Sequence, residues 1–156
     1  MYDYPSDLRN PRKSGLEGMV LQPVYHQDVL RVAYACSVFI IGFALFTGTP
    51  FNIGANVLLV LLGWQYSSPP LRLKEVPVID SFCNAAIVFL AWFIGFSFTG
   101  SSISQVPGKG YMLSLCTAGV HALAAAADAE ADEVSGQRTI ATALGRRSAA
   151  LFALLC

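Results

Sequence analysis

The sequence predicts an all-α bundle of helices that spans a membrane several times. Of its 156 residues, 54% are hydrophobic and only 13% are charged, and the mean hydropathy is +0.54. Several apolar runs approach the roughly 20 residues that a helix needs to cross the hydrocarbon core. Strand-like alternation of apolar and polar residues is missing, and a spanning backbone must satisfy its own hydrogen bonds. We therefore expect each run to be a helix.

Four apolar runs qualify or nearly qualify as spans, at about 29–48, 51–66, 78–100 and 111–127. A fifth begins near Ser148 and is cut off at Cys156. The second run is short, but it ends in Trp64 and Tyr66, and such aromatic residues suit the interface between membrane and water.

The charged residues predict on which side of the membrane each loop lies. Loops should alternate between the two sides, which places stretches 1–28, 67–80 and 128–147 together and connections 47–52 and 100–110 opposite them. All ten acidic residues and eight of the ten Lys and Arg then fall in the stretches of the first side, and Arg31 adjoins them at the start of the first run. Only Lys109 lies opposite. Because positive charge favours the inside, we expect this face to be cytoplasmic, or the equivalent side of an organelle membrane.

Two further observations exclude classes of partner and site. The formal net charge is zero, which gives no electrostatic reason to expect a nucleic-acid partner. The four cysteines lie far apart within apolar runs, without the spacing of a metal site or a disulfide framework, so we interpret them as small packing residues. They are Cys36, Cys83, Cys116 and Cys156.

Two pairs of aspartates, Asp3/Asp7 and Asp128/Asp132, share the spacing D-x-x-x-D on the charged side. On a helix this spacing places both carboxylates on one face, where they can hold a divalent cation that bridges phosphate oxygens. The alternatives are a solvated loop for the first pair and a helix end with ordinary surface acids for the second. Acids at the membrane end of a span are costly unless they face water, a cation or a partner, which favours a functional role.

The loop after the second run carries cations on the same side. Pro69 and Pro70 cannot continue a helix, so they end the second element and stiffen the turn. Arg72 and Lys74 follow. In isolation they could be an anchor of the positive-inside kind, but beside two carboxylate pairs they favour a role in holding phosphate.

In these residues the chain resembles the UbiA-type intramembrane prenyltransferases. Members carry a motif similar to N-x-x-x-D-x-x-x-D and a second, D-x-x-x-D followed by G-x-x-T, both on cytoplasmic-side loops. Asp3 and Asp7 match the acids of the first motif and Arg12 its downstream basic residue, whereas Asp128, Asp132, Gly136 and Thr139 match the second. Stretch 66–74 is similar to the family's tyrosine-to-lysine loop. The D-Y-x-S-D-x-x-N-P-R-K start and the H-A-x-x-A-x-x-D-x-E-A-D stretch most resemble the carotenoid-acting branch, the lycopene elongases.

The resemblance implies a fold and an extent. The family fold is a ring of nine transmembrane helices around a central cavity, and residues 1–156 would form a single partial domain with about five of the nine. The chain would begin at the end of the second helix and stop within the seventh. The asparagine of the first motif would fall before Met1, so we expect a chain truncated at both ends, whose polar start reflects missing upstream spans rather than targeting.

The resemblance also implies a mechanism. Two Mg²⁺ ions held by Asp3, Asp7, Asp128 and Asp132 would neutralise an allylic isoprenyl diphosphate, and Arg12, Arg72, Lys74 and Arg138 would complete the clamp as the C–O bond ionises. A lipophilic acceptor in the bilayer, either a polyene or an aromatic ring, would attack the allylic cation. Two alternatives stay open: a terpene cyclase of the same family, and a catalytically inactive membrane fragment. A transporter is disfavoured because the acids lie at the membrane face rather than in mid-span.

Other residues are candidates for handling the cation. Phe89, Trp92 and Phe96 have helical spacing and could stabilise a cation with their ring faces, although lipid contact or packing explains such a stripe as well. His121 lies two turns before Asp128 and could point into the cavity, where it could deprotonate the alkylated intermediate. The alternative is a packed or hydrogen-bonded histidine.

Overall fold

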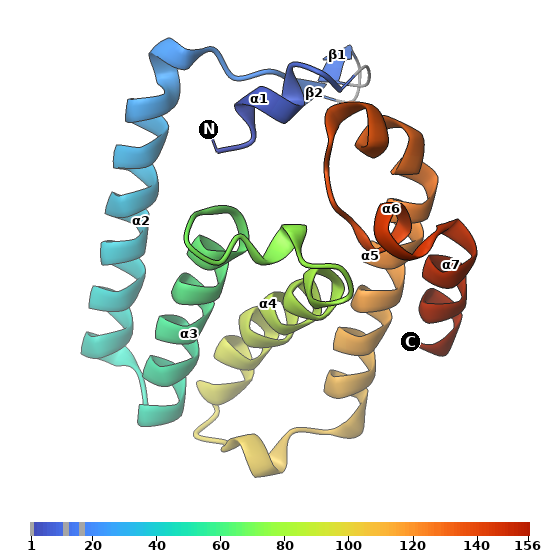
Figure 1. Ribbon diagram of the computed structural model, residues 1–156. Helices are drawn as coiled ribbons and strands as arrows, with labels where there is room; N and C mark the ends of the chain where they lie inside the picture. The colour runs from blue at the N-terminus through green and yellow to red at the C-terminus, as the bar shows by residue number, and fades with distance from the viewer. Residues whose placement is uncertain (1, 11–12, 16–17) are drawn as a thin grey trace.

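Figure 1 shows the chain as a computed structural model, which describes residues 2–10, 13–15 and 18–156. The long helices are α2 (His26–Thr47), α3 (Pro50–Ser67), α4 (Ile79–Ser97), α5 (Gly108–Ser135) and α7 (Arg146–Leu155). Short helices are α1 (Tyr4–Asp7) and α6 (Ile140–Leu144), with 3₁₀ turns η2 (Pro23–Tyr25), η3 (Leu73–Glu75) and η4 (Ile103–Gln105). Strands β1 (Ser14–Gly15) and β2 (Gly18–Met19) pair antiparallel, Ser14 with Met19 and Gly15 with Gly18. Apart from this short pairing, the predicted all-α fold is confirmed in the described residues.

The predicted spans are found as helices, with one difference in apolar character and one in length. Three helical stretches are long and apolar enough to cross a membrane: 23–46, α4 and α5. Helix α3, the second predicted span, falls outside this group, and it carries the polar residues Asn52, Asn56 and Gln65. Helix α5 continues to Ser135, so Asp128 and Asp132 lie on the helix itself rather than in a loop.

Local signals explain where α3 and α5 begin and end. Helix α3 starts with Pro50 after Thr49, whose hydroxyl oxygen accepts a hydrogen bond from the Asn52 N–H (3.3 Å). It stops before Pro69, as the sequence predicts. Helix α5 ends at Gly136, whose φ of +74° lies in the left-handed region that glycine adopts without steric cost.

Small and polar residues hold the helices together. Ala118 and Ala122 of α5 are fully buried, and a Cβ on the neighbouring Gly119 would lie 2.8 Å from the Ala153 carbonyl oxygen of α7. Between α3 and α4, the fully buried Asn52 donates to the Ile94 carbonyl (3.1 Å) and to the Ser97 hydroxyl (3.0 Å). Close backbones and interhelical hydrogen bonds are the two devices expected where lipid offers no hydrophobic driving force.

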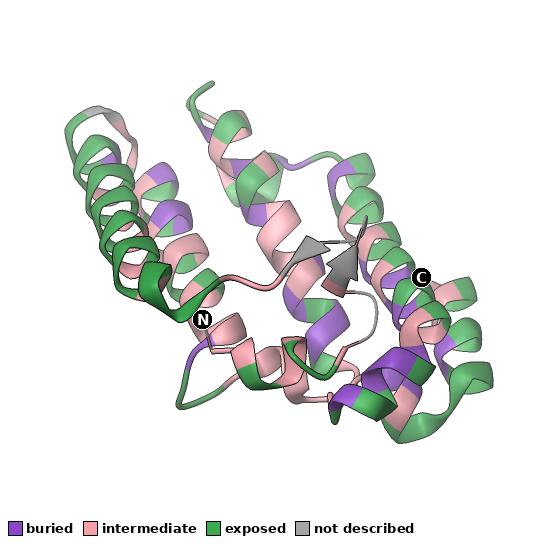
Figure 2. Cartoon of the chain, turned by 90° about the horizontal axis from the view of Figure 1, so that it is seen from above, coloured by how far each residue is buried: buried purple, intermediate pink, exposed green. Residues whose placement is uncertain are grey.

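Helix α2 presents apolar side chains at its surface. Phe39, Phe43 and Phe46 are exposed, as Figure 2 shows for most of this helix. Its contacts with α3 include a stacked pair of rings, Tyr34 and Trp64, with centroids 4.6 Å apart, and a hydrogen bond from the Trp64 indole to the Ser37 hydroxyl (3.0 Å). An exposed surface of this kind suits lipid or other membrane helices.

The long helices place the polar stretches at one end of the bundle. In Figure 1 the N-terminal segment, the loop between α3 and α4 and the turn after α5 lie toward one end, and the connections α2–α3 and α4–α5 lie at the other. This arrangement agrees with the alternation of loops predicted from the charges. All four cysteines are free thiols: Cys83 is buried and Cys156 half-buried, as packing residues would be, whereas Cys36 and Cys116 are exposed.

Candidate functional site

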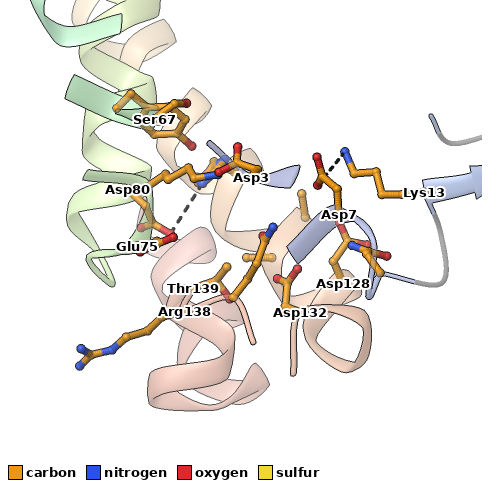
Figure 3. Close-up of a pocket in the computed structure, with 17 residues that line it drawn as sticks. Asp3, Asp7, Lys13, Ser67, Glu75, Asp80, Asp128, Asp132, Arg138 and Thr139 are labelled. Atoms are coloured by element: carbon orange, nitrogen blue, oxygen red, sulfur yellow. Dashed lines mark ion pairs between the residues drawn. The ribbon is translucent and has the colours of Figure 1, made fainter. Parts of the chain in front are cut away.

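A polar pocket of about 380 Å³ lies where the three polar stretches meet. The residues that line it come from the N-terminal segment, the α3–α4 loop and its flanking helix ends, and α5 with the turn after it (Figure 3). Both predicted acid pairs are among them, although they are more than 120 residues apart in sequence. The lining residues are Asp3, Asp7, Asn10, Lys13, Tyr66, Ser67, Lys74, Glu75, Asp80, His121, Ala124, Ala125, Asp128, Asp132, Gln137, Arg138 and Thr139.

The first acid pair sits on a single helical turn. Asp3 caps α1 and Asp7 ends it, and the Asp7 N–H donates to the Asp3 carbonyl (2.8 Å). The Ser6 hydroxyl also donates to the Asp3 carbonyl (2.8 Å), which fixes the turn. The predicted one-turn spacing of the two carboxylates is therefore present, with Asp3 at the cap position rather than inside the helix.

The second acid pair lies on the last two turns of α5, and the glycine and threonine that follow it shape the turn. The Gly136 and Gln137 N–H groups close the helix on the Glu133 (3.2 Å) and Asp132 (2.8 Å) carbonyls. Thr139 then caps α6 through hydrogen bonds with Thr142. This turn carries Gln137 into the pocket, where its side-chain amide donates to the Ser6 hydroxyl of α1 (3.3 Å). The turn that follows α5 thus joins the two acid-bearing segments through Gln137.

The predicted cations are placed in different ways. Lys74 Nζ forms an ion pair with Asp3 Oδ1, and Arg72 Nη2 lies 3.4 Å from the same oxygen and also pairs with Glu75. Arg138 lines the pocket but is exposed, and its guanidinium points away from the labelled carboxylates in Figure 3. Arg12 lies outside the described residues. Lys13, which sequence reasoning did not select, lies 3.9 Å from Asp7 through its Nζ.

Sequence reasoning also missed Asp80. This carboxylate lines the pocket although its exposed fraction is 0%. Its Oδ1 accepts hydrogen bonds from the Ser81 N–H (2.6 Å) and the Ser81 hydroxyl (3.2 Å), while Oδ2 has no hydrogen-bond partner among the described residues and lies 3.7 Å from His121 Nε2. The only signal in the sequence was an acid at the start of an apolar run, which a helix N-terminus explains equally well.

The aromatic residues Phe89, Trp92 and Phe96 do not line this pocket. They pack with one another along α4, with ring centroids 6.2 Å apart for Phe89 and Trp92 and 5.1 Å apart for Trp92 and Phe96. They also cover a buried cluster that includes Phe93 and Leu90. Of the two explanations that the sequence left open, packing is the one that this geometry favours.

The donor set of the pocket is compatible with magnesium. In the described part of the chain, no three His, Cys, Asp or Glu side chains converge as a ready-made metal cage. Mg²⁺ bound with a phosphorylated substrate uses only one or two carboxylates together with phosphate oxygens and water, so a pair of aspartates per ion is sufficient. The oxygen-only character of the two acid pairs fits such a hard cation.

Known proteins that resemble the chain fall in one family. The model of the UbiA prenyltransferase family matches residues 1–156. A C50 β-cyclic carotenoids biosynthesis protein of Dietzia sp. (strain CQ4) is 32% identical over 160 residues, covering 100% of this chain and 36% of that protein. A lycopene elongase/hydratase of Corynebacterium glutamicum is 32% identical, with 96% and 52% covered, and one of Halobacterium salinarum is 33% identical, with 93% and 50% covered. The chain thus spans about half the length, or less, of these relatives.

A solved structure shows the same arrangement of helices. The UbiA homolog from Archaeoglobus fulgidus bound to DMAPP and Mg²⁺ superposes with a TM-score of 0.73 at 25% sequence identity, and the match covers 95% of this chain and 52% of that one. The predicted partial ring is consistent with this match, and the carotenoid-related names of the relatives agree with the branch that the motifs resemble. From the family match over its whole length, the chain belongs to the UbiA prenyltransferase family.

Proposed function

We propose that this chain is the acid-bearing part of a membrane prenyltransferase, which transfers a prenyl group from an isoprenyl diphosphate to a lipophilic acceptor. The observation that carries the proposal is the meeting of Asp3/Asp7 and Asp128/Asp132 in one pocket with Lys74. Residues 1–156 act as one domain in this proposal, with the pocket on the cytoplasmic side. The homolog from Archaeoglobus fulgidus supports the choice of ligand, since it is bound to DMAPP and Mg²⁺.

In this proposal the aspartates of the pocket bind the metal ions and the basic residues bind the diphosphate. Asp3 and Asp7 would hold one Mg²⁺, and Asp128 and Asp132 another. When bound, these ions would neutralise the diphosphate and make it a better leaving group. Lys74 and Arg72, which contact Asp3, would place their charges on the phosphate oxygens. Lys13 is a further candidate beside Asp7.

The acceptor in this proposal is a polyene, and an aromatic ring is the second choice. The relatives named lycopene elongase/hydratase support the polyene, because a terminal alkene supplies the electrons that attack an allylic cation. Such an acceptor would reach the pocket from the bilayer, and exclusion of water from the bound complex would protect the cation before the attack.

The test is prenyl transfer by the native, full-length protein in membranes, with DMAPP, Mg²⁺ and lycopene. Asp128→Asn and Asp132→Asn should each lower turnover by about 10²-fold or more, because the charge that stabilises the departing diphosphate is lost. Glu133→Gln is the matched control, since Glu133 is exposed beside Asp132 and does not line the pocket. Full turnover in both aspartate variants would refute the proposal.

Two alternatives have distinct outcomes in the same assay. A terpene cyclase would convert a longer isoprenyl diphosphate without any added acceptor. An inactive membrane fragment would neither bind DMAPP in the presence of Mg²⁺ nor release diphosphate.

A further inference from the structure

A hydrogen-bonded group of side chains from three helices borders the pocket beside the acid pairs, and its members Tyr66, Asp80 and His121 line it. Asn84 of α4 donates through Nδ2 to the Tyr66 hydroxyl of α3 (2.7 Å) and to the Asp80 carbonyl (3.3 Å), and Nδ2 lies 3.3 Å from His121 Nδ1 of α5. On the other side of the ring, His121 Nε2 lies 3.7 Å from Asp80 Oδ2. Binding of diphosphate through the acid pairs makes no use of this group.

These contacts define the orientation of the imidazole ring. The Asp80 backbone carbonyl can only accept a hydrogen bond, so the side-chain nitrogen of Asn84 must face it, and the same nitrogen is then turned toward His121 Nδ1. An amide nitrogen cannot accept a hydrogen bond, which leaves Nδ1 with its lone pair and places the ring proton on Nε2, toward the Asp80 carboxylate. Asp80 is fully buried and its Oδ2 has no hydrogen-bond partner in the described residues, so it is available to stabilise positive charge on that ring.

The position of His121 suits the acceptor rather than the diphosphate. It precedes Asp128 by seven residues, or about 10 Å along α5. Ala124 and Ala125 line the pocket between the two, and their small side chains leave room for a substrate along this face. His121 is half-buried, with 30% of its side chain exposed, so it is reachable from the pocket yet held by its neighbours.

We propose that His121, positioned by Asp80, is the base that removes the proton from the alkylated acceptor; this rests on the prenyl transfer proposed above. The allylic C–O bond breaks and its electrons leave with the diphosphate. The acceptor alkene uses its π electrons to form the new C–C bond, which leaves a cation on the acceptor. A C–H bond beside that cation then breaks, its electrons form a new C=C bond, and the proton passes to His121 Nδ1, which gives up its contact with Asn84. The two N–H groups of the Asn84 amide keep the Tyr66 hydroxyl and the Asp80 carbonyl as their acceptors. Asp80 stabilises the resulting imidazolium.

His121 thus determines which of two products forms from the same cation. With the base in place, the cation loses a proton and becomes an alkene. Without it, the cation persists until water attacks it, and the oxygen then loses a proton to solvent and an alcohol results. The ratio of alkene to alcohol therefore reports on His121, whereas a residue needed only for folding or for binding would lower both products together.

The experiment uses the full-length protein in membranes with DMAPP, Mg²⁺ and lycopene, and measures DMAPP binding, diphosphate release and both products. His121→Gln should lower alkene formation by about 10²-fold or more, the usual contribution of a general base, and raise the alcohol fraction, while diphosphate release falls less than alkene formation does. Asp80→Asn should shift the product ratio in the same direction by a smaller factor, and Asp80→Glu should restore part of it. The double variant should be no worse than His121→Gln alone, because the two residues act as one unit.

Controls separate this inference from the proposed function. His26→Gln replaces the other histidine, which contacts the Leu21 carbonyl and the Tyr4 ring, and should leave the product ratio unchanged. An unchanged ratio in His121→Gln would overturn the role of His121 and leave prenyl transfer intact. Equal losses of binding, release and both products would also overturn it, since a structural role predicts that result. No diphosphate release by the wild-type protein would refute the proposed function itself, and the inference with it.

Discussion

Asp3 is the residue on which the charges of the pocket meet. Its carboxylate forms ion pairs with Lys74 and Arg72, which lie on a loop about seventy residues away in sequence. Arg72 also pairs with Glu75. A carboxylate that already carries cations is ready to exchange them when a metal and a diphosphate bind, because the cations can move a short distance to the phosphate oxygens. In the proposed function, Mg²⁺ and the diphosphate would compete with these ion pairs at Asp3.

Lys74 and Arg138 are placed differently in the pocket, and this difference predicts how much each contributes to binding of the diphosphate. Lys74→Ala should weaken Mg²⁺-dependent DMAPP binding by about tenfold or more, because a charge-assisted hydrogen bond contributes about 1.5–3 kcal/mol and 1.4 kcal/mol corresponds to a factor of ten. Arg138→Ala should have a smaller effect, since its guanidinium is exposed and points away from the carboxylates. Titration calorimetry in detergent compares the two, and Lys109→Ala at the other end of the bundle is the control. A larger loss for Arg138→Ala would contradict the placement.

The residues that could be predicted from sequence are those with a local pattern. Asp128 and Asp132 share one face of a single helix by spacing alone, and Asp7 follows Asp3 by one turn in the same way. Asp80 and His121 could not be predicted as a pair, because they meet only through the packing of α4 against α5. Nothing in the spacing of these two residues along the chain indicates that their side chains lie close together.

At the scale of elements, helix α5 contributes residues to the pocket and also packs closely against α7. Gly119 allows this contact, since a Cβ there would lie 2.8 Å from the Ala153 carbonyl oxygen and 3.1 Å from the Cys156 Cβ. A backbone oxygen cannot move aside as a flexible side chain can. Two helices must therefore separate if the glycine is enlarged.

We predict that Gly119→Ala lowers the free energy of unfolding by about 1–3 kcal/mol, the usual cost of overpacking. Gly42→Ala is the control, because nothing lies within 4 Å of the added Cβ and alanine is the better helix former. Thermal unfolding of both variants in detergent measures the difference. Equal stability of Gly119→Ala and the control would show that α5 and α7 are not in close contact.

Hydropathy alone does not predict where helix α5 ends or why helix α3 contains a buried polar residue. Helix α5 continues through the polar stretch that follows the apolar run, because its acids face a pocket rather than lipid, and hydropathy does not report that difference. Helix α3 carries the fully buried Asn52, whose side chain forms hydrogen bonds to α4 rather than facing lipid. The existence and order of these elements were predictable, but the role of their polar residues required the packed structure.

At the scale of the whole molecule, the order of the helices creates the site. Each crossing of the bundle reverses the direction of the chain, so stretches 1–28, 67–80 and 128–147 return to one end and together line the pocket there (Figure 1). The chain also spans only about half the length of its matched relatives, and helix α2 keeps an apolar surface that further helices or lipid would cover.

The arrangement predicts opposite accessibility for its two ends. With the native cysteines replaced, Glu133→Cys and Ser104→Cys place single thiols at exposed positions near the pocket and in the α4–α5 connection. In sealed right-side-out vesicles an impermeant thiol reagent should label Ser104→Cys at once and Glu133→Cys only after the membrane is opened, because the pocket is expected on the cytoplasmic side. Labelling of both from one side would rule out the alternating topology.

The central claim is that two distant acid pairs hold one metal-bound diphosphate. Its most direct test is a cycle of DMAPP binding in the presence of Mg²⁺, comparing wild type with Asp3→Asn/Asp7→Asn, with Asp128→Asn/Asp132→Asn and with all four changes combined. The account predicts that each pair variant alone abolishes most of the Mg²⁺-dependent affinity and that the combined variant loses little more, because the pairs share a ligand. Losses that simply add, or a pair that can be removed without effect, would contradict it.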